Sequence, residues 1–496
     1  MTAFLDQLLV VITAVQGFMW GTWMITILVG TGVVLTVATR GLQVRRLFES
    51  LALIFRRSSH SREGEGDISP FAALMTALAA TVGNGNIAGV ATAIATGGPG
   101  APFWMWVSGF FGMATKYAEG FLGVRFRRVA PDGTMLGGPM YYARDAVRNP
   151  RVGAFLGGGF AVAGAVAALL GTGNMAQSNS MALAFHDQFG VPYLASAVVL
   201  TVLVGLVIIG GIKRIGVVSE KLVPSMILLY LGGAMIILVA HIEQIPAAFR
   251  LIVESAFGIR AVAGALIGTT VQQAIRLGVA RGVLSNESGL GSAAIAQAAS
   301  KSDDPAKNGL LAMTGTFIDT LVVNTITTLT IVVTGAYQFT HAWRGPVSAE
   351  LVAAGGETAN MTSTALTAYA FNSVIPYGGF IIAVASFLFG YSTLLAWCYY
   401  GEQCVKYLAG IRITMAYRWA FLTLLFLGAL LQGEHLNIVW YVGDTFNAFM
   451  ALPNLIALFL LAGYVAKFTN DYFQDPQAAL DKLHAGQYLR EFKKKR

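Results

Sequence analysis

Long apolar runs recur along this sequence, and they constrain its fold more than any other feature. A stretch of about 20 apolar residues is long enough to cross the hydrocarbon core of a bilayer as a helix. Of the 496 residues, 55% are hydrophobic and 12% are charged, and that charged share is about half the usual share of a soluble protein. We therefore predict an all-α polytopic membrane protein with eleven transmembrane helices. The eleven segments are about 17–38, 69–97, 102–124, 153–185, 190–211, 217–240, 259–282, 309–336, 377–400, 417–432 and 438–466.

The distribution of basic residues predicts the orientation of these segments. With eleven crossings and the loop 39–68 placed in the cytoplasm, all of the 33 Lys and Arg residues except Arg250, Arg260 and Arg344 fall on the cytoplasmic side. Cytoplasmic loops are enriched in basic residues, so we expect an N-terminus outside and a C-terminus inside a bacterial-type inner (plasma) membrane. The net charge of +8 is then a topology signal and predicts no nucleic-acid partner. Residues 1–16 lack a basic start, which favours a surface helix over a cleaved signal peptide.

Ionisable groups inside the predicted helices are few. All six histidines fall in predicted loops or the tail, which leaves no buried imidazole for a proton relay or a metal. Two isolated acids, Asp319 and Asp444, could together form an intramembrane aspartyl protease. Neither has a full protease signature, so a hydrogen bond between helices is the favoured role for each, and no enzyme activity is predicted. Lys116 and Glu119 are three residues apart on one helix and are predicted to pair.

The stretch "TVGNGN" at 81–86 places helix-breaking residues inside a segment that is otherwise apolar enough for lipid. Each glycine costs a helix about 1 kcal/mol relative to alanine. Irregular backbone at membrane depth is tolerated only where it is buried in protein or lines a wet cavity. Close helix packing through Gly85 and Gly89 is one explanation. The alternative, which we favour, is a discontinuous helix whose freed amides and carbonyls bind a ligand near the midplane.

Several longer motifs resemble those of the alanine or glycine:cation (sodium) symporter family. They are "VGNGNIAGVATAIATGGPGAPFWMW" followed by "GMATKYAE", then "GNMAQSNS", "GGIKRIGVVSEKLVP", "ARGVLSNESGLGSA" and "LLAWCYYGEQC". The resemblance runs in order from about residue 66 to 466. It implies the ten-helix inverted-repeat fold of sodium-coupled amino-acid transporters. The family usually reads "TVGTGN", so Asn84 departs from it at a position that would border the substrate.

The hydrophobic segments agree with such a repeat. Without the first segment, which we treat as an accessory helix, ten remain as two groups of five, and the odd number gives the groups opposite orientations. We divide the chain into 1–68 (surface helix, accessory helix and basic loop), 69–240 and 241–466 (the two repeats), and a basic cytoplasmic tail, 467–496. The seventh segment opens with "AVAGALIGTTVQ". Its residues Leu266, Ile267, Gly268 and Thr269 are predicted to form the second discontinuity and to touch the substrate.

A sodium site is predicted at two adjacent hydroxyls. Na⁺ prefers hard oxygen ligands, and Ser392 and Thr393 stand in the middle of one segment. By themselves such residues more often bond to their own helix. The resemblance implies that the carbonyls of Ala79, Val82 and Phe389 join them as Na⁺ ligands. In proton-coupled relatives a lysine replaces this ion, and the candidate here, Lys221, lies too near the cytoplasmic end.

The substrate site is predicted beside this ion site. Backbone amides from Gly83 through Asn84 and Gly85 to Asn86 suit a carboxylate, and the side chains of Asn86 and Gln177 can accept from an ammonium group. By resemblance, Asn86, Gln177 and Trp397 are binding residues. Trp397 lies one helical turn from Thr393, and its indole would leave room only for a small substrate. A tryptophan anchored at the lipid interface is the alternative.

These expectations together predict a symporter that imports alanine or glycine with Na⁺ by alternating access. A proton-coupled amino-acid transporter of the same fold is the second possibility, and the intramembrane protease is the alternative of another class. Na⁺ is expected as the coupling ion. No cofactor and no obligate protein partner are indicated.

Overall fold

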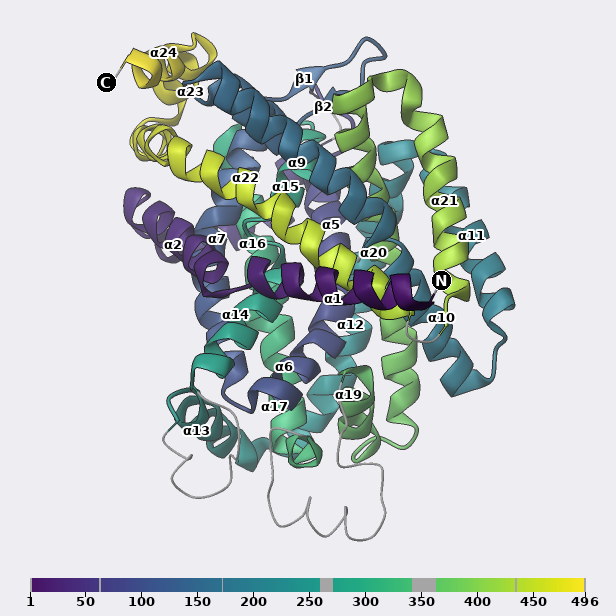
Figure 1. Ribbon diagram of the computed structural model, residues 1–496. Coiled ribbons are helices and arrows are strands. Elements are labelled where there is room, and N and C mark those ends of the chain that lie inside the picture. The colour runs from purple at the N-terminus through teal and green to yellow at the C-terminus, as the bar shows by residue number, and fades with distance from the viewer. Residues whose placement is uncertain are drawn as a thin grey trace.

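The computed structural model describes residues 2–61, 64–171, 173–258, 271–340, 363–432 and 435–494. Within them the chain is almost entirely helical, apart from one short antiparallel hairpin, β1 (Arg128–Val129) and β2 (Met135–Leu136) (Figure 1). The longer helices are α1 (Thr2–Met19), α2 (Thr22–Ala38), α4 (Leu47–Phe55), α5 (Pro70–Thr81), α6 (Val90–Gly97), α7 (Ala101–Arg125), α8 (Pro139–Ala146), α9 (Pro150–Leu170), α10 (Met175–Phe189), α11 (Tyr193–Ile208), α12 (Gly211–Ala240), α13 (Ile245–Ala256), α14 (Val271–Asn286), α15 (Ser292–Ala298), α16 (Pro305–Thr316), α17 (Thr325–Val333), α19 (Ser363–Asn372), α20 (Gly378–Ala409), α21 (Thr414–Leu430), α22 (His435–Tyr472), α23 (Pro476–His484) and α24 (Gln487–Lys494).

Each of the eleven predicted segments contains a helix. In the described residues, seven helices are long and apolar enough to cross a membrane, or eight if the bent pair of α5 and α6 is one span. The helix α7 is long, but it carries Lys116 and Glu119, and α11 has only 16 residues. The multi-pass helical prediction is therefore confirmed, while the number of eleven crossings stays a prediction.

The break predicted at "TVGNGN" is present. The helix α5 ends at Thr81, and Val82 is extended, with φ −75° and ψ 92°. A π-helical turn, η2 (Gly85–Gly89), leads into α6. The two halves are bent by 47° relative to each other. The N–H of Val82 still donates to Leu78 O, but the N–H of Gly83 bonds instead to Asn86 Oδ1 at 2.8 Å, so the regular helical pattern ends at Gly83.

A second break separates α14 from α15, and the sequence did not lead us to expect it there. Between them, residues 287–291 form no helix, and Glu287, Gly289 and Gly291 all have positive φ. The predicted discontinuity at Leu266–Thr269 lies outside the described residues. The two broken helices lie side by side, because α6 packs against α14 and α5 packs against α15. The breaks therefore face each other in the interior.

The two ends of the bundle differ. Figure 1 shows α23, α24 and the β1–β2 hairpin at one end, which we call the tail end, and α13 and α19 at the opposite end, the far end. The tail is folded: Lys493 Nζ donates to Asp145 O at 3.0 Å, and Arg125 Nη2 donates to Leu483 O at 3.2 Å. The basic residues Arg276 and Arg281 lie on α14, which packs against α6 and α13. They therefore lie in the far half of the molecule, away from Arg125 and Arg127, although the sequence prediction placed all of these residues on one side.

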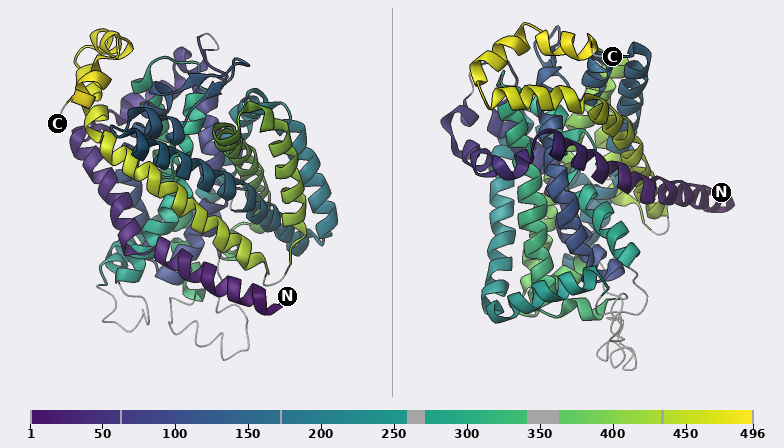
Figure 2. Two further views of the ribbon diagram at one scale, coloured as in Figure 1. Left: turned by 45° about the horizontal axis from the view of Figure 1, so that its top comes forward. Right: turned by 90° about the vertical axis from the view of Figure 1, so that its left-hand side faces the viewer.

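The N-terminal helix α1 crosses the other helices instead of running with them, and its start projects from the side of the bundle (Figures 1 and 2). It packs against α22. At its end, Trp20 Nε1 donates to Asp444 O at 2.9 Å. This crosswise placement is compatible with the surface helix that we predicted.

Candidate functional site: a cavity between two broken helices

A cavity of about 310 Å³ lies beside the two breaks. Its wall includes the end of α5, the turn η2, one face of α10, the end of α14 and the middle of α20. It extends to Thr92 on α6 and to Ser363 and Thr364 on α19. No residue before Ala80 on α5 lines it, so the cavity reaches toward the far end and not toward the tail end.

Five of the predicted substrate-binding residues line this cavity. They are Gly83, Asn84, Gly85, Gln177 and Trp397. Asn84 Nδ2 donates to Gln177 Oε1 at 3.1 Å, which joins the first break to α10. The Oδ1 atom of Asn84 is buried and has no hydrogen-bond partner within the described structure. Asn84, the position that departs from the family motif, thus offers a free acceptor at the cavity wall.

Asn86 is placed differently from the other predicted residues. It does not line the cavity, and it is fully buried. Its Oδ1 accepts from the backbone N–H of Gly83 at 2.8 Å. Its Nδ2 lies 2.6 Å from Asp319 Oδ1, 2.9 Å from Asn324 Oδ1 and 3.2 Å from Ser285 Oγ. In this geometry Asn86 holds the first break in shape.

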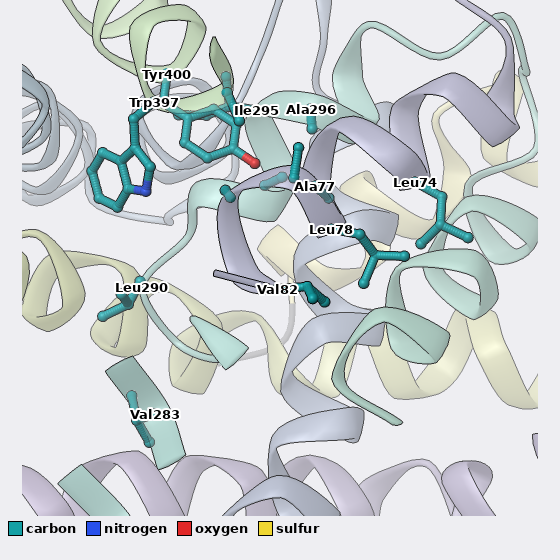
Figure 3. Packing of buried hydrophobic residues seen from close by; sticks show 14 of the residues in the cluster. Leu74, Ala77, Leu78, Val82, Val283, Leu290, Ile295, Ala296, Trp397 and Tyr400 are labelled. Atoms are coloured by element: carbon teal, nitrogen blue, oxygen red, sulfur yellow. The ribbon is translucent and has the colours of Figure 1, made fainter. Parts of the chain in front are cut away.

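Trp397 lies inside the protein. Its side chain is almost completely buried, and Figure 3 shows it pointing from α20 into the interior on the side of Leu290. The indole Nε1 donates to Glu287 Oε1 at 3.0 Å. The lipid-interface alternative for Trp397 is therefore wrong.

Sequence reasoning missed Glu287, a carboxylate on the cavity wall at the second break. Besides Trp397, the hydroxyl of Ser292 donates to it. Its φ of +54° is unusual for a residue other than glycine. Such backbone geometry is typical of functional sites, where the surrounding structure holds it in place. The available signal was an acid inside the glycine-rich stretch "NESGLG".

The second break is held by Glu119, a fully buried residue of α7. Its Oε1 accepts from the backbone N–H groups of Gly289 and Gly291, each at 3.0 Å. Asn454 Nδ2 on α22 donates to the same oxygen at 2.8 Å. Lys116 Nζ is buried without a hydrogen-bond partner in the described residues, so the predicted Lys116–Glu119 pair is not formed. Glu119 stabilises unpaired backbone amides instead.

The predicted sodium ligands come together where α20 crosses the end of α5. Ser392 Oγ lies 3.0 Å from Ala79 O and 2.9 Å from Phe389 O. Thr393 Oγ1 lies 3.3 Å and 2.9 Å from the same two carbonyls. Both hydroxyls are buried, and a Cβ added to Gly83 would stand 2.9 Å from Thr393 Oγ1. The fifth predicted ligand, Val82, is buried directly after α5. Four hard oxygens thus meet within contact of the first break.

The two intramembrane aspartates have separate surroundings. Asp319, in the π-helical turn η5 (Phe317–Asn324), bonds to Ser285 on α14 and to Asn86. Asp444 on α22 lines the cavity, and its backbone carbonyl accepts from Trp20 Nε1. The helix-to-helix hydrogen bonds predicted for the aspartate side chains are present for Asp319.

Comparison of the sequence with known proteins assigns this chain to a family. A sequence profile described as the sodium:alanine symporter family matches residues 5–485. The chain belongs to this family. A protein of Methanococcus maripaludis named sodium/alanine symporter AgcS is 47% identical over 462 residues, which cover 93% of this chain and 96% of that protein. A Bacillus subtilis protein named probable sodium/glutamine symporter GlnT is 33% identical over 468 residues, which cover 93% and 90%.

Among solved structures, a Na⁺-coupled sialic acid symporter in a substrate-bound, outward-open state matches with 16% sequence identity and a TM-score of 0.43. The match covers 90% of this chain and 86% of the other. The family assignment rests on the profile and on the sequence relatives. As a member of the sodium:alanine symporter family, the chain is a multi-pass membrane transporter and not an enzyme. The protease alternative is thereby excluded.

The packing of the Trp397 indole on Gly173 offers a first test of this site. A Cβ added to Gly173 would stand 2.8 Å from three atoms of the indole. Gly173→Ala should therefore displace Trp397, and overpacking of this kind costs about 1–3 kcal/mol. We expect the concentration of alanine at half-maximal uptake to rise about tenfold.

The matched control for this variant is Gly158→Ala on α9, because a Cβ there would meet nothing within 4 Å. Uptake by the Gly158→Ala protein should equal that of the wild type. Equal uptake by both variants would show that the position of the indole does not limit substrate binding.

Proposed function

We propose that this protein is a Na⁺-coupled symporter that imports a small neutral amino acid, alanine or glycine. The observation that carries the proposal is the oxygen cluster of Ala79, Phe389, Ser392 and Thr393, which lies against the same break that forms the cavity wall. An ion in this cluster would bind α20 to the end of α5 and stabilise the shape of the break. Substrate and ion affinities would then be coupled through Val82 and Gly83.

The cavity has groups for both ends of a zwitterion. The break at Gly83 and Gly85 offers backbone amides to the carboxylate, as half-helix ends do in other transporters. Gln177 Oε1, Asn84 Oδ1 and the carboxylate of Glu287 are acceptors for the ammonium group. Asn86 acts by orienting Gly83. Leu266, Ile267, Gly268 and Thr269 lie outside the described residues and stay proposed substrate contacts.

In this proposal Trp397 limits the size of the substrate. Its indole lines the cavity next to Glu287, and we propose that the side chain of the substrate points to this end. One relative carries the name of a probable glutamine symporter, so the scaffold can serve larger substrates. With the indole in place, we propose alanine and glycine for this chain.

The position of Lys221 argues against a lysine in place of the coupling ion. The candidate lysine, Lys221, is exposed on α12. Ser392 and Thr393 are buried against α5. An exposed ammonium group cannot replace an ion held by these hydroxyls, and we therefore propose Na⁺ as the coupling ion.

We further propose that transport proceeds by alternating access. Ten of the helices would form two inverted groups of five, in 69–240 and 241–466, and 1–68 would contain an accessory helix. The tail end, including 467–496, is the cytoplasmic side and the N-terminus lies outside, because the basic loops gather at the tail end. The cavity extends toward the far end, and we propose that the substrate enters from that side, the outside.

The tail end is closed by backbone hydrogen bonds that join the residues just before α5 to the residues just after α15 in the chain. Ile68 and Ser300 form a parallel β-bridge. The N–H of Asp67 donates to Ala299 O at 2.8 Å, and the N–H of Lys301 donates to Ile68 O at 2.7 Å. These bonds must break before the cavity can open to the cytoplasm.

Arg127 reinforces this closure. Its guanidinium donates to the carbonyls of Ser300 and Glu65 and to Asp303 Oδ1, the last at 2.8 Å. Burial lowers the pKa of Arg127, and the charge of Asp303 opposes that change. Arg127→Ala should therefore favour the inward-open conformation.

The measurement for Arg127→Ala is thiol labelling from the cytoplasmic side of a cysteine at Ala72, with Cys398 and Cys404 replaced by alanine. We expect labelling to become about tenfold faster, for a loss of about 1.4 kcal/mol of closure energy. Arg128→Ala is the matched control, since its exposed guanidinium bonds only to Asp145. Faster labelling in both variants, or in neither, would contradict the role of Arg127.

The test of the proposed function is uptake of labelled alanine by purified protein in proteoliposomes. We expect uptake when Na⁺ is higher outside, and none with a pH gradient alone. Uptake driven by the pH gradient without Na⁺ would instead establish the proton-coupled alternative.

A further inference from the structure

A second cavity, a groove of about 860 Å³, lies at the tail end between three helices. The end of α22, the start of α9 and the C-terminal helix α24 border it, and α22 packs against both of the other helices. Its apolar lining includes Val152 on α9 and Leu460 and Gly463 on α22. A Cβ added to Gly463 would meet nothing within 4 Å, so the groove is open at this residue.

The groove lies where both long helices change from apolar to basic. On α9, the side chain of Phe155 is 78% exposed, and Arg148 comes just before the helix. On α22, the side chain of Phe459 is 57% exposed, and Lys467 follows about two turns later. Exposed apolar side chains of a membrane helix face the acyl chains, whereas Lys and Arg reach the headgroups. The groove therefore runs from the level of the acyl chains to the level of the headgroups.

The charged side chains of the groove favour an anion. They are Arg148, Lys467 and Glu491, which together carry one excess positive charge. Lys467 is paired with Glu491, and its Nζ lies 5.7 Å from the centre of the Tyr488 ring. Arg148 is exposed, and its guanidinium makes no hydrogen bond or ion pair with the residues that the structure describes. A guanidinium in this position can bind a phosphate group, whose geometry it matches.

Aromatic contacts hold α24 beside the groove, at the tail end of the bundle (Figure 1). The ring centres of Phe492 and Tyr464 lie 5.8 Å apart, and those of Tyr488 and Phe468 lie 5.5 Å apart. The opposite face of α24 is exposed and basic, and it includes Lys494. An amphipathic helix with a basic polar face is typical of a segment that lies at the surface of an anionic membrane.

We propose that this groove binds one anionic phospholipid. One acyl chain would lie over Gly463 between α9 and α22, and the phosphate would contact Arg148 and the ammonium group of Lys467. Basic pockets between membrane helices on the cytoplasmic side recognise anionic headgroups in this way. The bound lipid would join α24 to the start of α9. This site is separate from the substrate cavity and does not depend on the proposed Na⁺ coupling.

Binding of dioleoylphosphatidylglycerol to the purified full-length protein in detergent, measured by native mass spectrometry, tests the groove. We expect one such lipid per wild-type protein, at a concentration at which dioleoylphosphatidylcholine does not bind. Gly463→Leu should weaken the affinity about tenfold or more, because the leucine takes the place of several CH₂ groups of the acyl chain. Gly232→Leu on α12 is the matched control, since a Cβ at Gly232 also meets nothing within 4 Å. It should bind the lipid as the wild type does.

Arg148→Ala tests the contact with the headgroup. It should weaken the binding of dioleoylphosphatidylglycerol about fivefold. High salt should diminish this loss, because ions screen exposed charges, and should leave the loss in Gly463→Leu unchanged. The matched control is Arg412→Ala, which removes an exposed arginine from the turn η8 (Ile411–Ile413) between α20 and α21.

Several results would overturn the inference. One is equal binding of the anionic lipid by the Gly463→Leu and Gly232→Leu proteins, and another is an equal loss in Arg148→Ala and Arg412→Ala. Equal binding of the two lipids by the wild type would show that the groove does not select an anion. A wild-type dimer that becomes a monomer in Gly463→Leu would assign the groove to a second copy of the chain instead.

Discussion

Replacing Ser392 and Thr393 together by alanine is expected to raise the Na⁺ concentration at half-maximal alanine uptake about 100-fold, because each lost oxygen–cation contact contributes about 1.5 kcal/mol. The two hydroxyls and the carbonyls of Ala79 and Phe389 form the cluster, and the carbonyls remain in the variant. The measurement is initial uptake of labelled alanine at a series of Na⁺ concentrations.

Thr423→Ala is the matched control for this loss. Its hydroxyl bonds only to Trp419 O on its own helix, in an exposed position on α21. Correct insertion of each variant is checked by its yield and its elution as a single species in detergent. If the double variant has the same Na⁺ activation as the Thr423→Ala protein, these hydroxyls do not coordinate the coupling ion.

Replacing Trp397 by alanine is expected to change which amino acids the protein transports. The indole is packed on Gly173 and donates to Glu287 at 3.0 Å, so its removal opens space at the side-chain end of the cavity. Loss of packing around a methyl group should cost alanine about 1–3 kcal/mol of affinity, or about 10- to 200-fold. Leucine and glutamine should gain, because the group that excluded them is gone. The measurement is competition by a panel of amino acids against labelled alanine.

Trp397→Phe separates volume from hydrogen bonding. It keeps a six-membered aromatic ring, smaller than the indole but far larger than the methyl group of alanine, and removes the N–H that donates to Glu287. We expect it to weaken alanine and still to exclude leucine. If Trp397→Ala weakens every amino acid equally and admits no larger one, Trp397 supports the cavity without setting its size, and the substrate's side chain lies elsewhere.

The architecture could be predicted from the sequence where the cause is local. Apolar runs of sufficient length form helices in a membrane whatever their neighbours are, since each backbone group must be bonded within its own segment. The glycines and asparagines at 83–86 interrupt α5 because of their own low helix propensity. The hydroxyls of Ser392 and Thr393 were visible as a pair in an apolar helix, and they lie in contact with Ala79 O as the family resemblance implied.

The roles of individual polar groups depended on contacts between distant segments. Nothing near Asn86 in the sequence shows that its side chain turns from the cavity to Asp319, 233 positions away. The pairing of Lys116 with Glu119 was inferred from helical spacing, but Glu119 bonds instead to the amides of Gly289 and Gly291.

The second break also shows the difference between what local sequence predicts and what contacts between distant segments decide. Propensity alone did not locate it at 287–291, because "NESGLG" also reads as an ordinary loop after a helix. Packing of α14 against α6 and of α15 against α5 brings it opposite the first break and places Glu287 on the cavity wall. The sequence determined which segments form helices and where the first must break, since these follow from local backbone energetics. The tertiary structure decided which polar groups meet, because a buried hydrogen-bonding group takes the partner that packing brings within reach.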